Sequence, residues 1–188
     1  MNQGVAKSNR RTLLLLLLVF LAPALGSWLL YMNVGRLHLG TTNHGEFVDP
    51  PKQLDAAGLD LPKDYLANHR WTLVYLGGAA CAADCERALN VMHLTQLALG
   101  EKVDAAQRLY LVDGPAPDPA KLKDGAGLVV ANVSHDATLL GAFDAPGVAA
   151  QYIYLVDPRG FLVMRYPLAG DPKWLLQDFR HLLGGGEG

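Results

Sequence analysis

The chain has 188 residues, a length suited to one globular domain and one additional segment. Its formal net charge is −2, so it lacks the strongly basic character of most nucleic-acid-binding proteins, and we expect no nucleic-acid partner. It also contains no glycine-rich phosphate loop, HExxH motif or nucleophile elbow, so the chemistries that those motifs support are not indicated.

The N-terminal segment is predicted to be a transmembrane anchor. Residues 12–32 are uncharged and almost wholly apolar, and about 20 helical residues span a hydrocarbon core of about 30 Å. Lys7, Arg10 and Arg11 precede this run, which predicts that residues 1–11 stay in the cytoplasm and that the rest of the chain lies outside it.

A cleaved signal peptide is the alternative explanation of the same segment. Ala22-Pro-Ala24 resembles a small-residue cleavage site. The apolar run nevertheless continues through Leu30, which favours an uncleaved anchor. Both explanations place the following domain outside the cytoplasm.

Residues 33–62 have the composition of a linker. They are rich in glycine, proline and polar side chains and contain few apolar clusters. Residues 45–48 could add a short strand. We therefore expect the folded domain to occupy residues 63–188.

The two cysteines of the chain follow directly on a predicted strand. Residues 71–76 form an apolar run that ends at two glycines, and Cys81 and Cys85 come next, at the start of a helix expected over residues 83–99. A helix N-terminus stabilises the thiolate, which is both the nucleophile and the ligand for soft metals. If both cysteines lie in the first helical turn, their Cα atoms are about 6 Å apart, within reach of a disulfide. The alternative is two buried cysteines that only pack.

The remaining elements follow in an order typical of one mixed sheet. We expect strands at 108–112, 152–156 and 161–166, a short strand or a packing segment at 128–130, and a short helix at 138–143. Asp171 and Pro172 begin the last helix as its N-cap and first residue. The order β–α–β followed by β–β–α predicts an α/β, thioredoxin-like fold, in which helices flank both faces of a mixed sheet.

Two segments carry a resemblance to a known family. The segment Val74-Tyr-Leu-Gly-Gly-Ala-Ala-Cys81-Ala-Ala-Asp-Cys85-Glu resembles the strand–CxxxC–helix motif of the Sco family, although the family's flanking prolines are absent. Residues 151–164 resemble the family's hairpin, with its sequence Tyr-Leu-Ile-Asp-Pro-x-Gly. Residues 42–51 resemble the linker of divergent, membrane-anchored Sco/SenC-like proteins of proteobacteria, which are found beside cytochrome c oxidase assembly genes.

The resemblance implies copper chemistry. Sco proteins are thioredoxin-like, copper-binding assembly proteins of cytochrome c oxidase, and they bind copper through both cysteines and a histidine. That histidine lies about five residues before the tyrosine matched by Tyr154, where this chain has Ala149. His135 precedes the third main strand, in a region that runs close to the dithiol in thioredoxin folds, and is the best available third ligand; a plain loop histidine is the alternative. Cys81 and Cys85 alone could hold cuprous copper.

The other histidines are weaker candidates for the metal. His93 follows Cys85 by about two helical turns, which is too far along a straight helix to share a metal with Cys81. His38 and His44 lie in the predicted linker and could reach copper only if the linker folded back.

The leading hypothesis is an assembly factor for a respiratory haem–copper oxidase, anchored in the bacterial inner membrane with its domain in the periplasm. Its Cys81–Cys85 dithiol would handle cuprous copper or reduce thiols at a copper site, and its partners would be cytochrome c oxidase subunits or other assembly factors. A general periplasmic thiol–disulfide oxidoreductase is the second hypothesis. A non-catalytic scaffold with a structural disulfide is the third.

Overall fold

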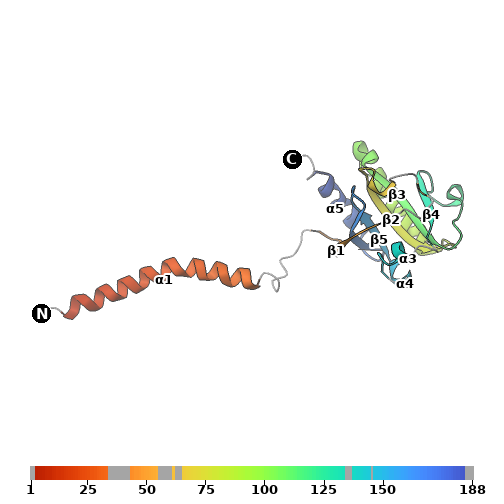
Figure 1. Cartoon of the computed structure of the whole chain (residues 1–188). Coiled ribbons are helices and arrows are strands. Elements are labelled where there is room, and N and C mark those ends of the chain that lie inside the picture. The colour runs from red at the N-terminus through yellow and green to blue at the C-terminus, as the bar shows by residue number, and fades with distance from the viewer. Residues whose placement is uncertain are drawn as a thin grey trace. The chain divides into compact units, whose positions relative to one another are not determined.

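The computed structural model describes residues 3–33, 43–54, 61, 65–133, 137–144 and 146–184. The chain divides into two compact units, Met1–Thr42 and Asn43–Gly188 (Figure 1). In the first unit, helix α1 (Gln3–Asn33) contains Pro23 and includes a stretch, Thr12–Met32, that is long and apolar enough to cross a membrane. The predicted N-terminal apolar helix is thus confirmed, whereas the choice between an anchor and a cleaved signal stays a prediction.

The second unit is built on one mixed sheet. Its described residues form six strands in the spatial order β1-β6-β5-β2-β3-β4. The strands are β1 (Glu46–Gln53), β2 (Trp71–Gly78), β3 (Ala106–Asp113), β4 (Leu128–Asn132), β5 (Tyr152–Val156) and β6 (Phe161–Pro167). Strands β2, β3 and β4 run parallel to one another, while β5 and β6 pair antiparallel on the other side of β2 and β1 adds to β6. The predicted thioredoxin-like order of elements is confirmed.

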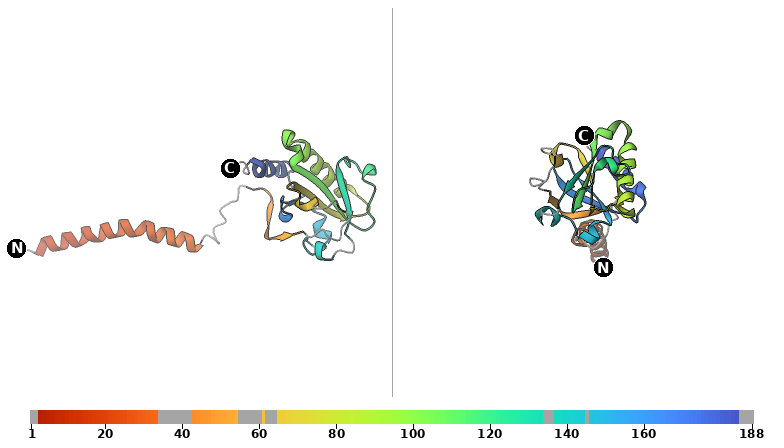
Figure 2. Two further views of the ribbon diagram at one scale, coloured as in Figure 1. Left: turned by 45° about the horizontal axis from the view of Figure 1, so that its top comes forward. Right: turned by 90° about the vertical axis from the view of Figure 1, so that its right-hand side faces the viewer.

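Helices cover both faces of this sheet (Figure 2). Because side chains alternate between the faces of a strand, the strands β2 to β6 contribute to two cores, one on each face of the sheet. One core packs against α2 (Ala83–Leu97) and α5 (Pro172–Gly184), and the other against α3 (Ala137–Leu140), α4 (Pro146–Ala149) and the short helix η1 (Tyr65–Ala67). Two further short helices, η2 (Gly100–Ala105) and η3 (Pro119–Lys121), lie in connections.

Strand β1 differs from the expectation. Residues 46–53 fall within the predicted linker, yet they form an edge strand that pairs with β6. The segment is held from both ends: the N–H of Leu54 donates to the Gly160 carbonyl at 2.9 Å, and the N–H groups of His44 and Gly45 donate to the Asp178 carboxylate at 2.8 and 2.9 Å. The sequence indicated at most a short strand at residues 45–48, because the anchoring carboxylate lies on α5, more than a hundred residues away.

Asp178 is the buried centre of this attachment. Its side chain is only 6% exposed and also accepts a hydrogen bond from the Tyr166 hydroxyl at 3.2 Å, while His44 Nδ1 lies 3.0 Å from the other carboxylate oxygen. Burial by itself raises the pKa of Asp178, but the hydrogen bonds from Gly45, His44 and Tyr166 outweigh it and hold the pKa below its ordinary value.

We expect Asp178 to make the domain sensitive to acid. A carboxyl group with a lowered pKa stabilises the fold above about pH 4, where the unfolded group is also ionised, and this contribution is lost as the pH falls through the folded-state value. Asp178→Ala should lower the free energy of unfolding by about 1–3 kcal/mol near neutral pH and flatten its dependence below about pH 4. Urea unfolding across this range measures both effects, with the exposed Asp104→Ala as the control. An unchanged acid dependence in Asp178→Ala would contradict this assignment.

Candidate functional site

The two cysteines lie where β2 passes into α2. Strand β2 ends at Gly78, Ala82 is the extended N-cap residue of α2, and the helix begins at Ala83. Cys85 therefore lies in the first helical turn. Cys81 lies just before the helix, because the extended backbone at Ala82 precedes the helical residues, so the two cysteines meet at the helix start but do not share its first turn.

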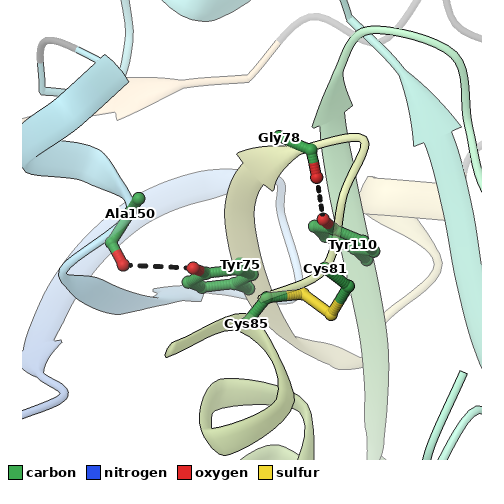
Figure 3. Close-up of a disulfide and its surroundings, with 6 residues drawn as sticks. All are labelled: Tyr75, Gly78, Cys81, Cys85, Tyr110 and Ala150. Carbon is green, nitrogen blue, oxygen red and sulfur yellow. Dashed lines mark hydrogen bonds between the residues drawn. A yellow bond between two sulfur atoms is a disulfide. The ribbon is translucent and has the colours of Figure 1, made fainter. Parts of the chain in front are cut away.

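Cys81 and Cys85 form a disulfide, with their Cα atoms 5.1 Å apart (Figure 3). The predicted reach of a disulfide is thus confirmed. The two sulfur-bearing residues differ in accessibility. Cys85 is 5% exposed and belongs to the core beneath α2, whereas Cys81 is half-buried at the edge of that core. In the reduced state Cys81 is therefore the residue that a partner can reach.

Charges near the disulfide oppose the effect of the helix. The N-terminal end of α2 favours a thiolate through its free N–H groups. The first turn also carries the acidic residues Asp84 and Glu86, whose side chains are exposed. Negative charges beside a thiol disfavour its ionisation. The thiolate character of the reduced pair is consequently a balance between the helix end and these two carboxylates.

Two tyrosines lie beside the disulfide on neighbouring strands. Tyr75 on β2 and Tyr110 on β3 are in register, and their rings stack with centroids 5.7 Å apart. The Tyr110 hydroxyl donates to the Gly78 carbonyl at 2.5 Å, and the Tyr75 hydroxyl donates to the Ala150 carbonyl at 3.1 Å (Figure 3). The two hydroxyls thus hold the backbone segments on either side of the disulfide.

Burial keeps both tyrosines neutral. Burial first, and then the neighbouring Tyr110 and Asp84, raise the pKa of Tyr75 to about 12. Burial also raises the pKa of Tyr110. Both hydroxyls therefore remain donors throughout the neutral range. The end of β2 also needs Gly77, because a Cβ atom there would lie 2.8 Å from Cε1 of Tyr75.

Sequence reasoning did not find these tyrosines. Each lies inside an apolar strand, where its ring passes for an ordinary core side chain. One signal was available in the sequence. A buried tyrosine hydroxyl needs a hydrogen-bond acceptor, so two tyrosines on adjacent strands indicate acceptors near the same end of the sheet.

The histidines predicted as candidate metal ligands are not brought together in the part of the chain that the structure describes. His135 and His38 lie outside the described residues. His44 faces Asp178, and its ring stacks on Trp174 with centroids 5.8 Å apart. Ala149, at the position matched to the Sco histidine, is fully buried in the core beneath the other sheet face. Among the described residues, no group of three His, Cys, Asp or Glu side chains could hold a metal ion.

Within the described ranges, the candidate ligands for copper are therefore Cys81 and Cys85. Two thiolates suit a soft cuprous ion, whereas cupric copper prefers nitrogen ligands as well. The roles of Cys81, Cys85 and His135 as metal ligands stay predictions.

The strand, dithiol and helix belong to a recognised family. The family described as the transmembrane-like, thioredoxin-like C-terminal domain matches residues 71–184, more than half of the chain. The chain belongs to this family. The match covers the elements from β2 to α5, which include the disulfide and both tyrosines. No curated protein sequence matches the chain.

Solved structures of Sco proteins share the fold of this thioredoxin-like family member. Copper-bound Sco1 from yeast is 17% identical with a TM-score of 0.55, and the match covers 77% of this chain and 95% of that one. Apo Sco1 from Thermus thermophilus is 16% identical with a TM-score of 0.52, covering 77% and 99%. A SCO1/SenC family lipoprotein from Bacillus anthracis is 12% identical with a TM-score of 0.50, covering 77% and 96%. The predicted likeness to Sco/SenC proteins is confirmed at the level of the fold.

Proposed function

We propose that this chain is a membrane-anchored assembly factor for a respiratory haem–copper oxidase, with Cys81 and Cys85 as its working group. The proposal rests on the disulfide between the end of β2 and the start of α2, whose two cysteines differ in exposure: Cys85 is buried and Cys81 is accessible. The fold shared with copper-bound yeast Sco1 supports the oxidase role. The apolar helix α1 supports attachment to a membrane.

The compartment follows from the N-terminal charges and from the disulfide. Basic residues before the apolar segment favour a cytoplasmic N-terminus, so the domain would lie in the periplasm of a bacterium, next to the inner membrane. Disulfides persist in that compartment and are rare in the cytosol. An oxidase copper site that faces the periplasm would then be accessible to the Cys81–Cys85 pair.

The first mode of action is the reduction of a cysteine pair at such a copper site. The Cys81 thiolate attacks the partner's disulfide, forms a mixed disulfide and releases one partner thiolate. The Cys85 thiolate then attacks the Cys81 sulfur, which releases the second partner thiolate and closes the Cys81–Cys85 disulfide. Two electrons pass to the partner, and a periplasmic dithiol reductant must restore the pair.

The second mode is delivery of cuprous copper as cargo, held by the two thiolates. Carrying copper requires the reduced pair, so both modes depend on the same redox equilibrium. His135, in the segment between β4 and α3, is the proposed third ligand.

The reduction potential and the copper stoichiometry test this chemistry together. A structural bridge should lie below about −300 mV, and an exchange-active pair above it. We expect a potential above this limit, and binding of at most one cuprous ion per reduced full-length chain in detergent. Cys81→Ser and Cys85→Ser should each abolish cuprous binding, whereas His135→Ala should change it little, and cupric binding should be weak.

Other results would redirect the proposal. Tight cupric binding that disappears in His135→Ala would show that His135 replaces the Sco histidine. A potential below the limit, with no binding of either ion, would contradict both modes and favour the scaffold with a structural disulfide. A reduction potential above about −300 mV, together with rapid reduction of unrelated disulfide proteins, would favour the general oxidoreductase.

A further inference from the structure

The loop that carries Cys81 is held at two neighbouring points, one on helix α2 and one on strand β3. One tie is the disulfide to Cys85 on α2. The other is the hydrogen bond from the Tyr110 hydroxyl to the carbonyl of Gly78, three residues before Cys81. Three residues reach at most about 10 Å, so the two ties constrain the same short stretch of backbone. Figure 3 shows both ties, with the Tyr110 ring beneath the loop.

Tyr75 extends this support to the other side of the disulfide. Its ring stacks on that of Tyr110, and its hydroxyl donates to the carbonyl of Ala150, which lies just before β5. Both tyrosines are at most 2% exposed. The stacked pair therefore forms one rigid support under the loop, with one hydroxyl directed to each flanking backbone segment.

We propose that Tyr110, supported by Tyr75, is a positioning residue that stabilises the disulfide form of the Cys81–Cys85 pair relative to the dithiol form. The disulfide requires the two Cα atoms to stay within about 4.4–6.8 Å, a requirement that the dithiol lacks. By holding Gly78, the Tyr110 hydroxyl restricts the positions of Cys81 and raises its effective concentration at Cys85. Once one of these two links has restricted the backbone, the other link forms with a smaller loss of conformational entropy.

The coupling must be reciprocal. If the tyrosine hydrogen bond favours the disulfide, the disulfide must favour the hydrogen bond by the same factor. Reduction adds two electrons and two protons to the sulfurs and removes one tie, so Gly78 and Tyr110 should become more mobile in the dithiol form. The proposal concerns the redox pair of the proposed function, yet it requires neither copper nor an oxidase partner.

Tyr110→Phe removes only the hydroxyl and keeps the stacked ring. The hydrogen bond should be largely lost in the dithiol form, so removing it should shift the thiol–disulfide equilibrium about threefold to tenfold toward the dithiol. That shift is a rise of about 15–30 mV in reduction potential. Tyr75→Phe keeps the ring stacked on Tyr110 and removes only the hydrogen bond to Ala150, so it should shift the equilibrium by a smaller factor or not at all.

Tyr154→Phe is the matched control. Tyr154 is a buried strand tyrosine whose hydroxyl donates to Asp144 at 2.8 Å, and it belongs to the core on the opposite face of the sheet. Its loss should destabilise the fold without changing the redox equilibrium. The full-length proteins in detergent would be equilibrated with mixtures of reduced and oxidised dithiothreitol, and the dithiol fraction measured by thiol alkylation.

A second measurement separates positioning from general stability. The thermal midpoint of each variant would be measured in the oxidised and in the reduced form. Tyr110→Phe should lower the midpoint of the oxidised form more than that of the reduced form, whereas Tyr154→Phe should lower both alike. Equal losses for Tyr110→Phe, or a redox shift in Tyr154→Phe as large as in Tyr110→Phe, would overturn the proposal.

Two remaining outcomes are also decisive. If Tyr110→Phe does not fold, hydrogen exchange of the Gly78–Cys81 backbone in the two redox forms of the wild-type protein decides, and equal protection in both forms overturns the proposal. If no dithiothreitol mixture reduces the wild-type pair, the proposed function fails while the positioning role is still tested. In that case the forms are compared after reduction in the unfolded state and refolding.

Discussion

Cys85→Ser should trap the partner protein on Cys81 as a stable mixed disulfide, and Cys81→Ser should capture nothing. Cys81 is half-buried and accessible, whereas Cys85 is 5% exposed and packed in the core beneath α2. Cys81 therefore makes the attack and Cys85 resolves the product. Without the Cys85 thiolate, the mixed disulfide cannot be released by the chain itself.

Both cysteine variants should also lose oxidase assembly. In cells that lack the wild-type protein, either variant should leave haem–copper oxidase activity at the level of the deletion strain. Non-reducing electrophoresis and mass spectrometry of the Cys85→Ser adduct should identify an oxidase subunit or another assembly factor, and the double variant Cys81→Ser/Cys85→Ser provides the baseline. Capture by Cys81→Ser instead of Cys85→Ser would reverse the assigned roles. Full oxidase activity in both single variants would remove the oxidase proposal.

Arg108→Met should cause one of the largest losses of stability available in the domain. The side chain of Arg108 is 1% exposed and donates to Gln96 Oε1 at 2.8 Å, to the Asp124 carbonyl at 2.9 Å and to the Ala126 carbonyl. It thereby joins β3, α2 and the turn before β4. Methionine fills much of the same volume but leaves three acceptors without their donor, which should cost about 3–5 kcal/mol.

Urea unfolding of the oxidised protein measures this loss. Arg159→Met is the matched control, because Arg159 also carries a charged hydrogen bond, to Asp157 at 2.9 Å, but its side chain is 79% exposed. The Asp157 carboxylate is itself buried but keeps hydrogen bonds from the backbone N–H groups of Arg159 and Phe161, so loss of the exposed guanidinium should cost about 1 kcal/mol or less. Similar losses in the free energy of unfolding for the two variants would show that the burial of Arg108 does not determine its contribution to stability.

The amino-acid sequence by itself determined the local part of the fold. Apolar runs of strand length, the two glycines that end β2 and the Asp171–Pro172 helix start are all signals within a few neighbouring residues. They sufficed to place β2, α2, β3, β5, β6 and α5, and hence the thioredoxin-like order. The four-residue spacing of Cys81 and Cys85 likewise sufficed to predict that a disulfide could close, because both positions lie in one short segment.

The tertiary structure alone decided which distant groups meet. The assignment of residues 46–53 to the sheet depends on Asp178, whose carboxylate binds backbone N–H groups more than a hundred residues earlier in the chain. The pairing of Tyr75 with Tyr110 depends on the register of β2 and β3, and the difference in exposure between Cys81 and Cys85 depends on where α2 packs. Composition and periodicity describe neighbours along the chain, whereas these contacts arise only after the sheet has formed.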